Sequence, residues 1–331
     1  MGKKNIFIIL IAFSGVARSE IINIPKKSGF SGFVTAGVSS GKYSSNLFKG
    51  PSKENIKNNG LMSSPEPHSF FLPIYSIDAR YTFADTGSQV FLGNLIQDSI
   101  RFDFTQQFGI RQKIDDYGIF SIGYVFSLSP SKTWKDPYTQ KEKKDTKMKS
   151  NGFRISLDNF YNTYLNIAYT SRNYKLDEEE SGRTLGLSQH DTDLLNRRGK
   201  SNEIELSYNF LISKNHVLQP RVSYSRYNLD GKAMSYDKTN FQFTYGYTGN
   251  QWSIASNVFS GFLNYNEKNP VYRKLADSNE YGLNSTILFN NISNISDLTY
   301  FLSLSYSKLS SEINFYDSEI KSINTGLIYH F

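Results

Sequence analysis

Cysteine is absent from this sequence of 331 residues. The folded protein therefore has no disulfide bridge and no metal site with thiolate ligands. After residue 19 the sequence also has no run of about eighteen apolar residues, the length that a membrane-spanning helix needs. Its mean hydropathy of -0.46 is typical of a soluble protein.

A strong excess of one charge is missing too. The 37 basic and 30 acidic residues give a formal net charge of +7. Loss of Lys3, Lys4 and Arg18 with the leader segment described next leaves 34 basic residues and a net charge of +4. Nucleic-acid binding requires a concentrated basic face, so we expect no nucleic-acid partner.

The first residues have the pattern of a secretory signal peptide. Lys3 and Lys4 precede an apolar segment, 6–13, that is too short to cross a bilayer as a helix. Ala17 and Ser19 supply the small residues that a cleavage site before Glu20 requires. We therefore expect residues 1–19 to direct export through the Sec pathway. The alternative is a buried N-terminal helix.

The rest of the chain shows apolar and polar residues in strict alternation. In 298–307, for example, leucines and tyrosines alternate with serines, Thr299 and Phe301. This period of two is the pattern of a strand whose two faces meet different surroundings. About fourteen such segments are predicted, at 29–47, 71–84, 88–95, 99–113, 118–128, 151–158, 163–174, 202–212, 217–229, 236–248, 252–265, 280–290, 298–309 and 320–331.

The connections between these segments alternate in length. Tight turns are expected at 85–88, 115–118, 160–163, 213–216 and 249–251, and long polar loops at 48–70, 129–150, 175–201 and 266–279. Short periplasmic turns and long outer loops are typical of outer-membrane barrels. We therefore predict an all-β fold: a transmembrane antiparallel up-and-down β-barrel over 29–331, preceded by a periplasmic segment, 20–28. Twelve or sixteen strands, or a soluble β-sandwich, are the alternatives.

The last strand carries a further signal. Phe331, Tyr329 and Leu327 lie on one face of a strand, because strand side chains alternate. A chain that ends on such an aromatic face is typical of proteins recognised by the barrel-assembly machinery. We expect these three residues to form that assembly signal, on a strand that runs into the periplasm, and we expect His330, Ile328 and Asn324 to face the lumen.

Several motifs resemble the domain of unknown function 2860 family of Gram-negative outer-membrane proteins. They lie at 24–32, 80–83, 90–94, 101–104, 193–199 (Asp-Leu-Leu-Asn-Arg-Arg-Gly), 269–272 (Asn-Pro-Val-Tyr) and 314–318 (Asn-Phe-Tyr-Asp-Ser). The resemblance covers nearly the whole mature chain. It implies the fold and the compartment but no activity, and so no catalytic residues.

If the aromatic faces meet lipid, a set of charged residues faces the lumen. The candidates are Asp78, Arg80, Arg101, Asp103, Arg111, Arg154, Asp158, Arg172, Glu203 and Glu205. Later strands face inward with small polar residues. A charged wall opposite a small polar wall indicates a pore with a transverse field, which orients charged solutes. Alternatively, the charges pair across neighbouring strands and stabilise the barrel.

The loop sequences indicate binding partners less specifically than the strands indicate the fold. The acidic run 177–180 is expected to be a solvated surface loop, since no calcium-binding spacing is present. The lysines of the 129–150 loop are candidates for contact with lipopolysaccharide phosphates. They are Lys132, Lys135, Lys141, Lys143, Lys144, Lys147 and Lys149.

These features favour a porin-like channel for passive diffusion of small polar solutes. The main alternative is a surface structural or adhesion barrel with a closed lumen that acts through its loops. A hydrolase is a weaker alternative, since only His190 beside Asp191 suggests a site. We expect no enzymatic activity, no cofactor and no metal. The expected partners are outer-membrane lipid, lipopolysaccharide and, during biogenesis, the assembly machinery.

Overall fold

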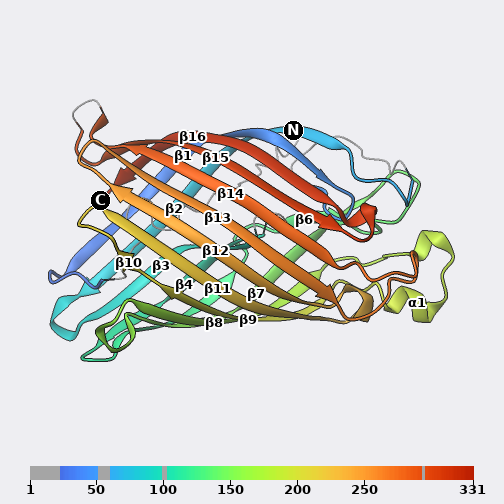
Figure 1. The fold of residues 1–331 in the computed structure, drawn as a ribbon, viewed down its shortest axis with the longest axis horizontal. Coiled ribbons are helices and arrows are strands. Elements are labelled where there is room, and N and C mark those ends of the chain that lie inside the picture. The colour runs from blue at the N-terminus through green and yellow to red at the C-terminus, as the bar shows by residue number, and fades with distance from the viewer. Residues whose placement is uncertain (1–22, 51–59, 99–102, 293–294) are drawn as a thin grey trace, which may run out of the picture.

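The strands form a closed antiparallel barrel (Figure 1). The computed structural model describes residues 23–50, 60–98, 103–292 and 295–331, so the predicted signal peptide 1–19 lies outside the described residues. The strands are β1 (Gly29–Ser45), β2 (Pro67–Phe83), β3 (Ser88–Asp98), β4 (Asp103–Ile114), β5 (Gly118–Phe126), β6 (Ser131–Trp134), β7 (Asp145–Asp158), β8 (Leu165–Leu176), β9 (Gly199–Tyr208), β10 (Phe210–Leu211), β11 (His216–Leu229), β12 (Tyr236–Thr248), β13 (Trp252–Tyr265), β14 (Ser278–Phe289), β15 (Leu298–Ser311) and β16 (Ser318–His330).

Among the described residues, helix occurs only in short segments of the connections. They are α1 (Gln189–Asp193) and the 3-10 turns η1 (Ala84–Thr86), η2 (Phe160–Asn162), η3 (Arg183–Leu185), η4 (Lys232–Met234) and η6 (Asn314–Tyr316). In the described part of the chain no helix is long and apolar enough to cross a membrane.

The wall of the barrel has fourteen strands within the described residues, as predicted. Each strand pairs with the next along the chain, and β16 closes the ring on β1 with Phe33 opposite His330 and Ser45 opposite Ser318. β6 is a short strand that pairs with β7 above β5, and β10 continues β9 beside β11 after Asn209. Each of the fourteen wall strands has a neighbour on both sides, although β2 and β3 pair only between Ala79–Phe83 and Ser88–Leu92. A closed ring of strands is the condition for a sheet to span a membrane.

The two ends of the barrel differ as the sequence predicts (Figure 1). The C-terminus lies at the end with the short turns, and α1 lies at the opposite end among the long loops. The last strand therefore runs towards the end with short turns, which in an outer-membrane barrel is the periplasmic end.

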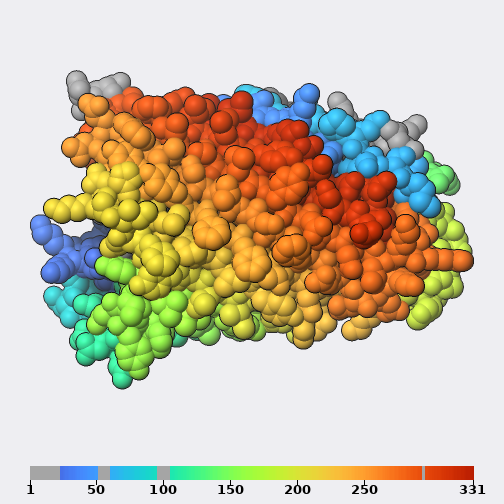
Figure 2. Space-filling model, in the orientation of Figure 1, coloured from blue at the N-terminus to red at the C-terminus, as the bar shows by residue number. Residues whose placement is uncertain are grey.

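The outward face is a belt of large apolar side chains. On β12, Phe241 and Phe243 are exposed, and on β9 so are Ile204 and Leu206. Figure 2 shows a continuous wall of side chains over β11 to β16. Such a large apolar surface is unfavourable in water, and a barrel that turns it to lipid removes this cost.

Some strands extend beyond their predicted bounds. β7 begins at Asp145 rather than at 151, and β9 begins at Gly199 rather than at 202. The added residues that point outward include Lys147, Lys149 and Lys200, which are exposed. Because these strand ends lie above the apolar belt, their outward side chains are lysines, and the outward apolar residues that mark the rest of the strand are missing.

The inward face is less uniformly polar than predicted. Small polar side chains such as Ser39, Thr170 and Asn324 do point inward, but they are buried. Apolar side chains also point inward on β2, where Leu72 and Ile74 are buried. The interior of the barrel is therefore largely covered by its own side chains in this conformation.

Candidate functional site

Of the ten predicted lumen charges, eight lie on inward positions with described side chains. Arg101 lies outside the described residues. Asp103 begins β4, but its side chain is also outside the described part. The eight are Asp78 and Arg80 on β2, Arg111 on β4, Arg154 and Asp158 on β7, Arg172 on β8, and Glu203 and Glu205 on β9.

The strongest grouping is a hydrogen-bonded row that crosses β7, β8, β9 and β11. The Arg154 guanidinium donates two hydrogen bonds to the Glu205 carboxylate, of 2.9 and 2.7 Å, and one of 2.7 Å to the Thr170 hydroxyl. Glu203 accepts a hydrogen bond of 2.6 Å from Ser225 on β11. A bidentate pair of this kind is strong and directional, so it fixes four strands of the wall to one another.

The other charges also have partners nearby. Arg80 Nε donates to Asp78 Oδ1 on the same strand at 2.7 Å. The Arg111 guanidinium lies 3.9 Å from the centre of the Phe91 ring, and Arg172 lies 5.0 Å from that of Tyr174. These residues therefore match the alternative in which the charges pair within the wall. A transverse field across the lumen stays a prediction.

Two features of the inner wall were missed. Lys238 on β12 forms an ion pair of 2.5 Å with Glu280 on β14, both nearly buried. Arg221 on β11 also points inward and interacts electrostatically with Glu205. The expectation that later strands carry only small polar residues inside was wrong at these positions, although the alternation of β12 already places Lys238 on the same face as Gln242 and Thr244.

A hydrophobic core, which we call the outer cap, lies at the outer end of the barrel. It joins the upper ends of strands to the outer loops. Its buried members are Leu47, Tyr138, Tyr174, Leu195, Tyr227, Met234, Tyr236, Leu263, Tyr265, Ala276, Leu309, Ile313, Phe315 and Tyr316. The long loops were predicted as polar, and their inward-folded apolar residues were not recognised.

A cluster of aromatic and amide groups lies in the middle of the outer cap. The Tyr138 and Tyr316 hydroxyls are 2.7 Å apart, and Asn269 Nδ2 donates to both, at 3.2 and 2.6 Å. The ring of Tyr138 stacks on Phe315 with centres 5.5 Å apart. Three loops that are far apart in the sequence are thus joined at one buried point. Burial raises the pKa of Tyr138 to about 12, against the opposing effect of its hydrogen bonds with Tyr316 and Asn269.

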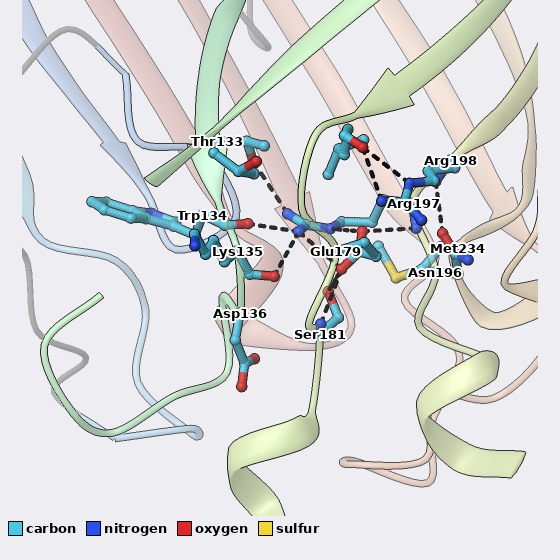
Figure 3. A network of polar contacts seen from close by, with 12 residues as sticks. Thr133, Trp134, Lys135, Asp136, Glu179, Ser181, Asn196, Arg197, Arg198 and Met234 are labelled. Atoms are coloured by element: carbon cyan, nitrogen blue, oxygen red, sulfur yellow. Dashed lines mark hydrogen bonds and ion pairs between the residues drawn. The ribbon is translucent and has the colours of Figure 1, made fainter. Parts of the chain in front are cut away.

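An ion pair within the loop between β8 and β9 joins this loop to β6, beside the outer cap (Figure 3). Arg197 Nε donates to Glu179 Oε2 at 2.9 Å, and its Nη2 donates to the Trp134 carbonyl at 2.6 Å. Burial alone would raise the pKa of Glu179, but attraction and hydrogen bonds from Arg197, with hydrogen bonds from Ser181, hold it below its usual value. The expectation of a solvated acidic run was therefore wrong for Glu179, whose side chain is nearly buried.

Lys143 was also placed wrongly among the exposed lysines. Its side chain is buried and donates to the Asn46 carbonyl at 3.1 Å. Its ammonium lies 5.3 Å from the Trp134 ring centre and 5.9 Å from that of Phe315. Burial lowers the pKa of Lys143 to about 7, opposed by attraction to Asp136.

Beneath the outer cap is a cavity of about 60 Å³. Apolar side chains such as Leu176, Tyr227 and Tyr236 line it, together with Arg197. Because Arg197 and Thr133 line it beside the apolar residues, this pocket is not purely apolar.

One sequence signal could have revealed the outer cap. Three of the motifs that carry the family resemblance, 193–199, 269–272 and 314–318, lie in outer loops. They supply Arg197, Asn269, Phe315 and Tyr316. Apolar and amide residues within otherwise polar loops indicate a packed structure rather than a solvated one.

The histidines do not gather into a site. His68 and His190 lie at the outer end, and His216 and His330 lie near the short turns, on four different elements. His190 is exposed on α1, and His216 Nδ1 lies 2.7 Å from the Tyr245 hydroxyl. Among the described residues, no three His, Asp or Glu side chains are close enough together to bind a metal ion.

The predicted assembly residues point outward. Leu327, Tyr329 and Phe331 are each more than 40% exposed, whereas Asn324 and Ile328 on the alternate positions are buried. This agrees with the predicted orientation of the last strand, but their role in assembly stays a prediction.

A closed barrel of fourteen strands with an apolar belt outside and charged groups inside defines a transmembrane β-barrel of the bacterial outer membrane. The chain belongs to the family described as "Protein of unknown function (DUF2860)", whose model matches residues 29–330. A comparison with curated proteins found no match.

Solved structures with a similar fold are outer-membrane proteins. OmpT of Vibrio cholerae, folded in vitro, is 9% identical, with 95% of this chain and 100% of that chain covered and a TM-score of 0.43. The outer membrane channel DcaP of Acinetobacter baumannii is 8% identical, with 96% and 100% covered and a TM-score of 0.44. OccK3 of Pseudomonas aeruginosa is 12% identical, with 90% and 95% covered and a TM-score of 0.34. Likenesses this distant say nothing about what this chain transports or binds.

Proposed function

We propose that this protein is a porin-like channel for small polar solutes, and that the outer cap is its gate in the closed position. The observation that carries the proposal is the charged row from Arg154 to Ser225, on the inner wall of a fourteen-stranded barrel. Charged side chains inside a barrel are costly to bury, and they are more readily maintained where water and solutes reach them. Residues 1–19 would direct export through the Sec pathway.

The outer cap determines how such a channel would work. Tyr138, Phe315 and Tyr316 are buried in the outer cap, and in this proposal solutes enter from outside only after the loops separate. A barrel of fourteen strands lies between the packed eight-stranded barrels and the open porins of sixteen or more. Movement of the loops, without change in the wall, would therefore open a path of intermediate width.

A planar-bilayer recording of purified protein tests the proposal. Phe315→Ala removes a buried aromatic ring from the outer cap and should weaken it by about 3–5 kcal/mol. The open fraction should rise by at least about a hundredfold, because each 1.4 kcal/mol is a factor of ten. The variant should show stepwise conductance far more often than the native protein. Phe243→Ala, on the exposed face of β12, is the matched control and should behave as the native protein does.

The outer cap also supports a second candidate, a surface barrel with a permanently closed lumen that acts through its loops. The same recording separates the two. If the native protein and Phe315→Ala both remain silent while they migrate as folded, heat-modifiable barrels, the channel proposal is refuted and the second candidate is favoured.

A further inference from the structure

The outward face above the apolar belt carries a basic groove between β8, β9 and β11. It encloses about 580 Å³ and is lined by Asn173, Tyr174, Lys175, Arg198, Gly199, Lys200, Asn202, Asn228, Leu229, Asp230 and Lys232. Four cations face one carboxylate, so the groove has a net charge of +3. Three asparagines add neutral donors to the same surface.

The cations of the groove are available to a ligand. Within the described residues, Lys175, Lys200 and Lys232 are exposed and form no ion pair. Arg198 donates to the Leu176 carbonyl at 3.1 and 2.9 Å, which fixes its direction but does not neutralise its charge. Asp230 is the groove's single anion and is held beside Arg198 by a backbone hydrogen bond of 2.8 Å to the Arg198 carbonyl.

The register of the strands brings like charges together at this place. Lys200 lies directly between Asn173 of β8 and Asn228 of β11. Lys175 lies directly opposite Lys149 of β7, with both side chains exposed on the outward face. Like charges in opposed positions on neighbouring strands destabilise a sheet, and a bound anion would remove this repulsion.

The height of the groove matches the headgroup layer of the membrane. Tyr169, Ile204 and Tyr224 form an exposed cross-strand row, and Asn173 lies four residues above Tyr169 on β8. With about 3.3 Å per residue and a strand tilt of about 40°, that separation is about 10 Å along the membrane normal. Exposed tyrosines such as Tyr169 and Tyr224 are typical of the edge of the hydrocarbon, so we place the basic groove at the level of lipid phosphates.

We propose that the basic groove binds a phosphate group of an outer-leaflet lipid headgroup, in the manner of the lipid A portion of lipopolysaccharide. Arg198 and the three lysines bind the phosphate oxygens through charge-assisted hydrogen bonds. Asn173, Asn202 and Asn228 face the sugar hydroxyls beside the phosphate. The site is independent of the proposed channel function, because it lies outside the barrel.

The test uses the purified full-length barrel in neutral detergent, with bound lipid counted by native mass spectrometry. The probes are diphosphorylated lipid A and the same lipid without its phosphates. The groove variant combines Lys175→Gln, Lys200→Gln and Lys232→Gln. The control variant removes as many exposed charges near the short turns, by Lys26→Gln, Lys113→Gln and Lys214→Gln.

We expect the native protein and the control variant to bind one diphosphorylated lipid at least about tenfold more tightly than the groove variant does, since charge-assisted contacts to phosphate are lost there. The lipid without phosphates should bind all three proteins equally. The proposal would be overturned if the control variant bound the diphosphorylated lipid as weakly as the groove variant, or if the groove variant bound it as tightly as the native protein. Displacement of the lipid by inorganic phosphate at the same concentration would show a site for free phosphate, which also refutes a lipid site.

Discussion

The buried amine of Lys143 makes the stability of the outer cap depend on pH. Its pKa of about 7 in the closed form compares with 10.5 in water. Between pH 7 and 10.5 the opened loops therefore bind more protons than the closed form, so closure becomes more favourable as pH rises. Each pH unit corresponds to about 1.4 kcal/mol, and the full effect between these limits is about 5 kcal/mol.

The gain in stability of the closed form with rising pH should stop both below and above this pH window. Below pH 7 Lys143 is charged in both forms, so its contribution stays at its most unfavourable value. Above pH 10 the tyrosines oppose it, because burial raises the pKa of Tyr138 and of Tyr316 above the usual value of 10. These two groups keep their protons in the closed form and lose them in the open form, so closure becomes less favourable again. Closure should therefore be most stable near pH 10.

The perturbation is Lys143→Met, which keeps the length of the side chain and removes the charge. It should abolish the rise in stability between pH 7 and 10 and make the outer cap more stable at pH 7. At pH 7 the closed form should gain about 5 kcal/mol, because no amine has to lose its proton on burial. From this gain about 1–3 kcal/mol is subtracted, because the Asn46 carbonyl loses its hydrogen-bond donor. Lys144→Met, at the exposed neighbouring position, is the control and should keep the native pH dependence.

Trp134 is a reporter for this experiment. It is buried beside Lys143, and the sequence holds only two tryptophans. In a Trp252→Phe background, acrylamide quenching of Trp134 measures how often the outer cap opens. Quenching should be greater at pH 6.5 than at pH 9 in the native protein and equal in Lys143→Met. Equal quenching at the two pH values in the native protein would refute the reasoning.

Three further predictions concern the wall. Phe108→Lys on the exposed face of β4 should lower the free energy of unfolding in lipid vesicles by about 2–4 kcal/mol, and a neutral result would mean that this face does not meet lipid. Glu205→Ala should lower the free energy of unfolding by about 3–5 kcal/mol because Arg154 loses its carboxylate partner. In urea unfolding, the double variant Arg154→Met with Glu205→Ala should recover part of this stability, and no recovery would argue against the pair. Deletion of Phe331 should reduce the amount of assembled barrel in cells, and normal assembly would contradict its role as a signal.

The strands could be predicted because their signal is local. In β12, the alternation of Phe241 and Phe243 with Gln242 and Thr244 fixes both the element and its outward face. The fourteen strands and the asymmetry of the connections follow from repeating this test along the chain. The prediction failed where the local signal stops, as at the start of β7, where Lys147 and Lys149 point into water.

The lumen charges were predictable as a set but not as pairs. The phase of β9 places Glu203 and Glu205 inside. Which cation meets them depends on the register between strands: Glu205 lies opposite Ala168 of β8, yet its carboxylate reaches Arg154 on β7 beyond. Sequence alternation gives the face of each residue, whereas its partner depends on strand tilt and side-chain length.

By itself, the sequence predicted the class of the protein, a count of about fourteen strands, the direction of the last strand and the face expected to meet lipid, because a period of two is encoded within each strand. Only the tertiary structure decided that the outer loops pack into one buried core. Tyr138 and Tyr316 are separated by 178 residues and meet through loops that have no periodic pattern. Contacts of that range form only after the barrel wall has placed the loop ends side by side, so no local pattern in the chain predicts them.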